Sequence, residues 1–196
     1  MSLPDKLLRK FSLAMGMTKT KDSRSYHFVG VIDCIMNQNT RDAGAAAFPA
    51  MNWQILQLCH QYNVGILQMP CPEIAFLGFA RARPPGKSIR DALETQDGKA
   101  CCRKLSTDIA DRIEETIRQN AECLAILGGN PESPGCAVHA ENAEESTPSG
   151  VLITELRDEL QQRNIQIPFR GIRDFDATLM AEDLGWLKQL FVKKKL

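Results

Sequence analysis

The sequence has no excess of charge of either sign, because 24 Lys and Arg residues balance 24 Asp and Glu residues in 196 positions. Proteins that bind nucleic acid or an anionic membrane through electrostatics carry a basic surface, so we expect neither partner. No apolar run approaches the roughly 20 residues that cross a bilayer. The charged N-terminal stretch also lacks the apolar segment of a secretory signal. We therefore expect a cytoplasmic protein.

A second absence concerns the cysteines, since no two of them have the C-x-x-C spacing. This excludes the usual zinc-ribbon and thioredoxin-type motifs. An odd number of cysteines without a secretory signal also argues against a disulfide framework. The seven positions are Cys34, Cys59, Cys71, Cys101, Cys102, Cys123 and Cys136. Any metal site must therefore combine cysteines that are distant in the chain.

Short apolar runs alternate with amphipathic helical patterns along most of the chain. The runs predict strands over 27–34, 64–71, 123–129 and 165–169, and the patterns predict helices over 51–63, 107–122, 151–164 and 176–194. Residues 74–100 and 130–150 are predicted to be rich in loops. Alternating strands and helices require right-handed crossovers. The expected fold is therefore α/β, a Rossmann-like parallel sheet with helices on both faces and a ligand site at the carboxyl ends of the strands.

The same patterns divide the chain into two unequal parts. Residues 1–26 are expected to form an N-terminal helical extension, because apolar positions between 4 and 15 have helical spacing, and 27–196 a single α/β domain. Within that domain, Thr107 is the expected N-cap of its helix. Cys101 and Cys102 are expected in the loop before it. No internal repeat is evident.

Three cysteines follow three successive predicted strands. Cys34 ends the first strand, Cys71 ends the second, and Cys136 lies in the loop after the third. Parallel strands bring their carboxyl ends to one edge of the sheet, so these thiols can converge there. They suit zinc with an open fourth position, or an iron–sulfur cluster with one iron not bound by cysteine. They can also be three small apolar residues with no shared role, as we expect for Cys59 and Cys123 in the core.

Three segments of the sequence resemble the thiouracil desulfidase family. They are "DCIMNQNTRDAG", "MPCPEIAFLGFARARPPG" and "ESPGC", and the similarity extends over roughly residues 27–170. The family has Leu-Leu-Gly after its first cysteine and an "SPSCG" motif. This chain has Ile35, Met36 and Asn37 after Cys34, and "SPGCA" as its third motif. The cysteines are present in both patterns, and the residues around them differ.

The resemblance implies a [4Fe–4S] cluster held by Cys34, Cys71 and Cys136, with one iron open to the sulfur of a thiolated small molecule. The implied reaction is C–S cleavage by water, with release of hydrosulfide and no net electron transfer. Zinc is the lesser possibility for the cofactor. The alternative function is a non-enzymatic cluster- or zinc-binding module for redox sensing or sulfur delivery. The sequence leaves the oligomeric state open.

Four polar residues are expected to act in the site, and three of them, Glu73, Ser133 and Arg83, match positions of the family's motifs. Glu73 of the "CPE" motif and Ser133 of "SPGC" are the expected catalytic residues, and Arg83 and Asn37 are expected to bind substrate. Pro72 stiffens the chain between Cys71 and Glu73 by fixing its own φ angle. Simpler interpretations stay open: Glu73 as a charge at a helix start, Ser133 as a turn residue, and Arg83 as a brace for a proline-rich loop. His139, three residues beyond Cys136, is the histidine closest to these motifs.

Overall fold

A four-stranded parallel sheet forms the centre of the protein in the computed structural model, which describes residues 22–139 and 148–194. In the order β2-β1-β3-β4, the strands are Gly65–Met69, His27–Ile32, Glu122–Gly128 and Phe169–Gly171. All neighbouring pairs are parallel, which confirms the predicted α/β, Rossmann-like class. Most of the predicted N-terminal extension lies outside the described residues, and 22–26 have no regular structure.

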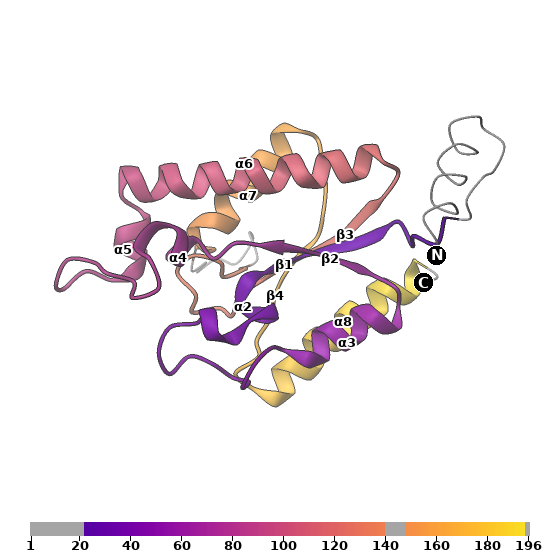
Figure 1. Ribbon diagram of the computed structural model, residues 1–196, viewed down its shortest axis with the longest axis horizontal. Helices are drawn as coiled ribbons and strands as arrows, with labels where there is room; N and C mark the ends of the chain where they lie inside the picture. Colours follow the sequence, from indigo (N-terminus) through magenta and orange to yellow (C-terminus); the bar gives the residue numbers. More distant parts are fainter. Residues whose placement is uncertain (1–21, 140–147, 195–196) are drawn as a thin grey trace, which may run out of the picture.

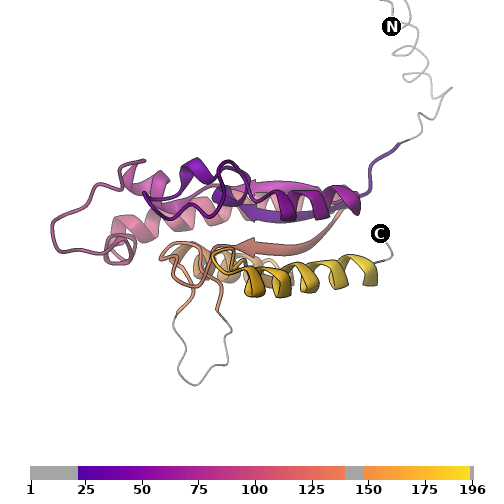
Figure 2. The same ribbon diagram turned by 90° about the horizontal axis from the view of Figure 1, so that it is seen from below.

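Helices cover both faces of this sheet (Figure 1). One face carries α6 (Gln96–Arg118) and α7 (Val151–Gln162), and the other carries α3 (Trp53–Gln61) and α8 (Ala177–Lys193). In Figure 2, α3 and α8 run side by side, as their contacts require. No helix within the described ranges is long and apolar enough to cross a membrane.

Burial differs between the inner and outer strands. β1 and β3 are buried along nearly their whole length, which explains the continuous apolar runs "FVGVI" and "CLAIL". β2 and β4 are only partly buried, because each lies at an edge of the sheet. The second apolar run, which by its composition could pass for a buried strand, is therefore an edge strand.

Two strand boundaries also differ from prediction. β1 ends at Ile32, and one helical turn, α2 (Asp33–Met36), follows it, so Cys34 lies just beyond the strand. A short 3₁₀ helix, η1 (Gln38–Thr40), comes next. β4 begins only at Phe169, because the preceding Pro168 has no N–H to donate to the sheet. The apolar residues before that proline pack against the core instead.

The segment predicted to be rich in loops over 74–100 is a loop over 78–88 and about half helical in all. It contains most of α4 (Pro72–Leu77), all of α5 (Ile89–Leu93) and the start of α6. At Gly98 a Cβ would lie 2.4 Å from the Ala92 carbonyl oxygen. Glycine therefore allows α6 to pass close to the backbone of α5, a tertiary requirement that overrides the low helix propensity of glycine.

α6 begins at Gln96, well before the predicted start at 107, so several residues lie in a different element than predicted. Thr95 is the N-cap, and its side chain accepts a hydrogen bond of 3.1 Å from the backbone N–H of Gly98. Thr107 consequently lies inside the helix, and Cys101 and Cys102 are helical residues. The predicted N-cap and the predicted loop position of the two cysteines were both wrong.

The connections diverge at the carboxyl edge of the sheet between β1 and β3. The chain leaves β1 through α3 toward β2 on one side, and leaves β3 through α7 toward β4 on the other. Such a switch in direction opens a crevice in which α/β proteins bind their ligands.

Candidate functional site

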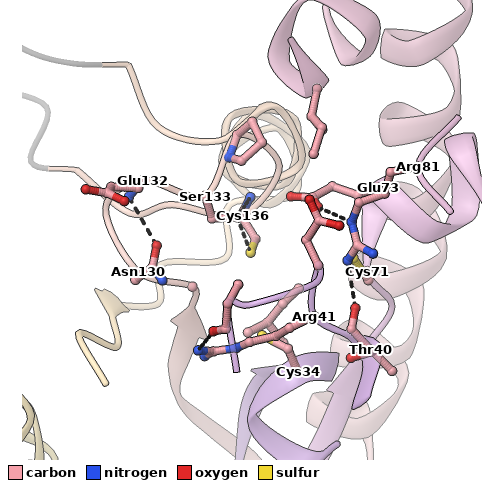
Figure 3. Close-up of a pocket in the computed structure, with 16 residues that line it drawn as sticks. Cys34, Thr40, Arg41, Cys71, Glu73, Arg81, Asn130, Glu132, Ser133 and Cys136 are labelled. Atoms are coloured by element: carbon pink, nitrogen blue, oxygen red, sulfur yellow. Dashed lines mark hydrogen bonds and ion pairs between the residues drawn. The ribbon is translucent and has the colours of Figure 1, made fainter. Parts of the chain in front are cut away.

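A cavity of about 230 Å³ lies at this crevice, and we call it the thiol pocket (Figure 3). Its walls come from the segments that follow β1, β2 and β3. The side chains with chemical functions in its lining are Cys34, Thr40, Arg41, Asp42, Cys71, Glu73, Arg81, Asn130, Glu132, Ser133 and Cys136. The pocket therefore lies where the strand order predicts a ligand site.

The three cysteines singled out in the sequence all line this pocket. Cys34 lies in α2, Cys71 is the N-cap of α4, and Cys136 lies in the loop after β3. Cys136 is buried, and the other two are partly buried. Cys59 and Cys123 lie in the hydrophobic core away from the pocket. The structure thus brings together thiols that are 37 and 65 residues apart in the chain (71 − 34 and 136 − 71).

Burial raises the pKa of each of the three thiols. The pKa of Cys71 is raised to about 11, and that of Cys136 well above its ordinary value. The pKa of Cys34 is also raised by burial, and the positive charge of Arg41 offsets part of this effect. A neutral thiol is a poor nucleophile, while a thiol that coordinates a metal is deprotonated. Their setting therefore suits coordination better than direct attack on a substrate.

The loop that carries Cys136 is held in place by close glycine contacts. A Cβ at Gly129 would lie 2.6 Å from the Cys136 sulfur, and one at Gly135 would lie 2.6 Å from Cγ of Pro72. Gly135 is the position at which this chain has "SPGC" in place of "SPSC". The glycine lets this loop pack directly on the "CPE" segment, so two of the three motifs are in contact.

The start of α7 closes the same loop from the other side. The backbone N–H of Leu152 donates to the carbonyl oxygen of Gly135 at 2.9 Å, and that of Val151 donates to Pro134 at 3.2 Å. A Cβ at Gly150 would lie 2.3 Å from the backbone nitrogen of Cys136. The position of Cys136 is therefore set by backbone contacts with a helix as well as by its own loop.

Glu73 and Arg81 form a buried ion pair in the wall of the pocket. Arg81 Nε donates to Glu73 Oε2 at 2.8 Å, and Arg81 Nη2 donates to the carbonyl oxygen of Thr40 at 2.7 Å. Their side chains are only 10% and 3% exposed, respectively. Glu73 lies in the first turn of α4, and Gly78, with a φ of +74°, ends that helix and turns the chain back. The pair holds the carboxylate against the cavity.

The arginine predicted to bind substrate lies elsewhere. Arg83 is exposed, does not line the thiol pocket, and donates to the carbonyl oxygens of Lys87 and Arg81. Arg81, two residues earlier, lies in the wall with a φ of +46°. Nothing in the "ARARPPG" spacing distinguishes these two arginines, because the difference arises from the turn after Gly78.

A second buried ion pair involves Arg41, which lines the pocket on the β1 side. Arg41 Nη2 donates to Asp174 Oδ2 at 2.6 Å, and Asp174 is fully buried. Arg41 also interacts with Cys34, which links the pair to one of the thiols. Within the described residues, Asp174 Oδ1 has no hydrogen-bond partner. The predicted substrate contact Asn37 is exposed outside the pocket, where it caps η1.

Ser133 is directly engaged with a cysteine. Its Oγ lies 3.0 Å from the sulfur of Cys136 and accepts a hydrogen bond of 3.3 Å from the backbone N–H of the same residue. His139 does not line the thiol pocket, and its Nε2 lies 3.0 Å from the carbonyl oxygen of Pro131. The serine is therefore placed to orient Cys136, while the histidine belongs to a different surface.

A single metal ion and a cluster make different demands on the three thiols. Among the described residues, no group of three or more His, Cys, Asp or Glu side chains is arranged to hold a single metal ion. A zinc ion needs its sulfur ligands about 2.3 Å from one point. Cys34, Cys71 and Cys136 share a cavity instead. A polynuclear cluster makes a different demand, because each thiolate binds a different iron and the sulfur atoms need not meet at one point.

Comparisons with known proteins identify a distant relative. The chain is 27% identical over 133 residues to the uncharacterized protein MJ0003 of Methanocaldococcus jannaschii, a stretch that covers 68% of this chain and 77% of that protein. No protein-family model matches the chain. No solved structure matches it either. Since the relative is uncharacterized, the functional argument rests on the site itself.

Proposed function

We propose that this protein is an iron–sulfur-dependent desulfidase that removes sulfur, as hydrosulfide, from a thiolated small molecule such as a thiopyrimidine. The observation that carries the proposal is the convergence of Cys34, Cys71 and Cys136 on one cavity that a buried carboxylate, Glu73, also lines. The sequence resemblance to the thiouracil desulfidases supports the same function. The cavity volume of about 230 Å³ is in keeping with a small substrate.

The three cysteines would hold a [4Fe–4S] cluster and leave one iron without a protein ligand. When bound, the cluster supplies a Lewis acid that polarises the C–S bond of the substrate. Arg41 interacts with Cys34, and Arg81 lies near Cys71. Their positive charges offset part of the negative charge that deprotonated cysteines bring into a buried site.

Glu73 is the acid–base group in this proposal. Arg81 holds one carboxylate oxygen of Glu73, and the carboxyl group lines the cavity, where it can take a proton from water and return one to the substrate. Water replaces the sulfur on carbon, and the sulfur leaves as hydrosulfide, so no electrons are gained or lost. Ser133 keeps Cys136 in position. Arg83 and Asn37 do not line the cavity. Arg41 and Asn130 do line it, and these two residues are the proposed substrate contacts.

One observation favours a second candidate function. The Glu73–Arg81 pair also joins α4 to the segment after β1 through Thr40, which is a structural role that requires no catalysis. A cluster-binding module for redox sensing or sulfur delivery would use the three cysteines in the same way. The two functions then differ in whether the Glu73 carboxylate is needed for activity.

The test measures cofactor and activity on the same anaerobic preparations. The wild-type protein is expected to contain iron and sulfide and to release hydrosulfide from 2-thiouracil or a related thiopyrimidine. Glu73→Gln should lower this release by about 10²- to 10⁴-fold, because the proton-transfer group is lost, with iron content unchanged. Retention of full activity in Glu73→Gln would favour the binding module.

Matched cysteine variants test the site. Cys34→Ser, Cys71→Ser and Cys136→Ser should each lose iron, because each removes one of the three ligands. Cys59→Ser is the control, since Cys59 is buried in the core and lies outside the thiol pocket. Equal loss of iron in all four variants, or stoichiometric zinc in place of iron in the wild type, would contradict the proposed cluster.

A further inference from the structure

The buried carboxylate of Asp174 takes no part in the proposed reaction, although it pairs with an arginine of the thiol pocket. Asp174 follows β4, beyond the stretch that resembles the desulfidases, and its side chain is 0% exposed. Its Oδ2 accepts from Arg41, and its Oδ1 has no hydrogen-bond partner in the part of the chain that the structure describes. Burial of a charge costs free energy that a single ion pair often does not recover. Stability alone is therefore a weak reason for this arrangement.

Asp174 fixes the direction of the Arg41 guanidinium. Arg41 Nη2 donates to Asp174 at 2.6 Å, and Nη1 donates to the carbonyl oxygen of Ala45 at 3.0 Å. The same guanidinium interacts with Cys34, which lies beside it in the pocket (Figure 3). Arg41 is only 7% exposed, yet it lines the cavity, while Asp174 does not. The positive charge is therefore in contact with a buried anion and with a proposed cluster ligand.

The main chain at Cys34 has a separate anchor. Gln38 is buried, its Nε2 donates to the carbonyl oxygen of Cys34 at 2.7 Å, and its Oε1 accepts from the backbone N–H of Ala47 at 2.9 Å. These contacts tie α2 to the loop after η1 without the help of Asp174. What Asp174 adds is consequently the position of a charge and not the path of the backbone.

We infer that Asp174 is a positioning residue of the thiol pocket, which holds the Arg41 guanidinium against Cys34 and the cavity. This inference rests on the proposed function, because the charge matters most when Cys34 binds a cluster as a thiolate. Residues that orient the surroundings of a metal ligand usually change metal affinity or activity by about 10- to 100-fold when they are replaced. An arginine suits this position because its planar group makes several fixed contacts at once.

NMR of arginine side chains in the metal-free, full-length protein tests the contact itself. A guanidinium held by several partners rotates slowly and gives separate Nη–H signals, and those of Arg41 are the ones that disappear in Arg41→Gln. The wild type should show them, and Asp174→Asn should lose them. Asp33→Asn is the matched control, since it removes a carboxylate that also lies near Cys34 but bonds to Gln68. Unchanged Arg41 signals in Asp174→Asn, or their absence from the wild type, would overturn the inference.

A double-substitution cycle tests the consequence for the cluster. After anaerobic cluster assembly, the rate of iron transfer to a chelator should rise about 10- to 100-fold in Asp174→Asn and in Arg41→Gln. The double variant should lose iron no faster than Arg41→Gln, because Asp174 acts through that arginine. Effects that multiply in the double variant would mean that Asp174 acts independently of Arg41, which contradicts a positioning role.

Arg41→Lys separates positioning from charge balance, and it carries the test if Asp174→Asn fails to fold. This variant keeps a cation opposite Asp174, but lysine lacks the planar group that contacts Asp174, Ala45 and Cys34 together. Iron should therefore be lost about as fast as in Arg41→Gln. Retention of iron at the wild-type rate would show that a cation alone is sufficient, against the inference. A wild-type protein that holds no iron would contradict the proposed function, and the NMR comparison would then decide the inference.

Discussion

The thiol pocket borders the same loop as a second cavity, which is lined by Arg157, Arg170 and Arg173 among others and which we call the arginine pocket. The two pockets differ in how their arginines are held. In the thiol pocket, each cation has one anion, as Glu73 pairs with Arg81 and Arg41 with Asp174. In the arginine pocket, two arginines share Asp183. The lining of the thiol pocket also contains Asp42 and Glu132, so its carboxylates outnumber its arginines among the described residues, and its soft ligands are the three thiols. The lining of the arginine pocket, among the described residues, contains no thiol.

The comparison shows that one edge of a parallel sheet can carry two cavities with different linings. The topology brings both pockets to the carboxyl ends of the strands. The residues behind each wall then decide which groups face the cavity. The arginine pocket depends on a buried carboxylate of α8, while the thiol pocket depends on tight backbone packing around Cys136. Different substitutions can therefore disturb one pocket without the other.

The largest expected effect is on the carboxylates that anchor the arginines. Asp183→Asn should lower the free energy of unfolding by about 3–5 kcal/mol, as is usual when one partner of a buried ion pair is removed. Asp174→Asn should cost less, because Asp174 pairs with a single arginine through one oxygen only. Denaturant unfolding followed by circular dichroism measures both values. An equal or larger loss in Asp174→Asn would contradict the charge-sharing account of the arginine pocket.

The next effect concerns the backbone contacts of the thiol pocket. Gly150→Ala should destabilise the protein by about 1–3 kcal/mol, because the added Cβ overlaps the backbone at Cys136 and something must move. The Cys136 thiol should also react faster with a thiol reagent, measured by mass spectrometry after limited labelling.

A matched glycine provides the control for that prediction. Gly185 lies within α8, and a Cβ there would meet nothing within 4 Å. Gly185→Ala should therefore raise stability by about 0.5–1 kcal/mol through better helix propensity. Similar melting temperatures for the two variants would show that the contact at Gly150 does not constrain the loop.

The two pockets also differ in how much of each can be predicted from the sequence alone. The convergence of Cys34, Cys71 and Cys136 follows from the order of strands and helices, because parallel strands end at one edge whatever their side chains. The Arg41–Asp174 pair joins residues 133 positions apart, and neither residue lies in a motif that indicates its partner. Such pairs depend on how the loops after β1 and β4 pack, which local patterns do not encode.

Errors in the predicted elements have related causes. The start of α6 was missed because Gly98, a poor helix former, is required by the close approach of α5. Arg81 lines the thiol pocket and Arg83 does not, and the sequence does not reveal the positive φ of Arg81 that accompanies this difference. The arginine pocket was not predicted at all. Its cations come from α7, β4 and the segment after β4, and they converge only in the folded chain.

The smallest expected effect is the pH dependence of the arginine pocket. Burial by itself would raise the pKa of Asp183, but hydrogen bonds from Arg173 and Arg170 outweigh it and hold the pKa below its ordinary value. A carboxylate with a lowered folded-state pKa stabilises the protein above its unfolded-state pKa, and this contribution is lost as the pH falls through the folded-state value. Arg170, Arg173 and the nearby Glu182 are the charged groups that surround this network. The stability difference between the wild type and Asp183→Asn should therefore narrow as the pH is lowered from about 5 toward about 2. Urea unfolding at several pH values measures this difference, and a constant gap would show that Asp183 is anchored by packing and not by its charge.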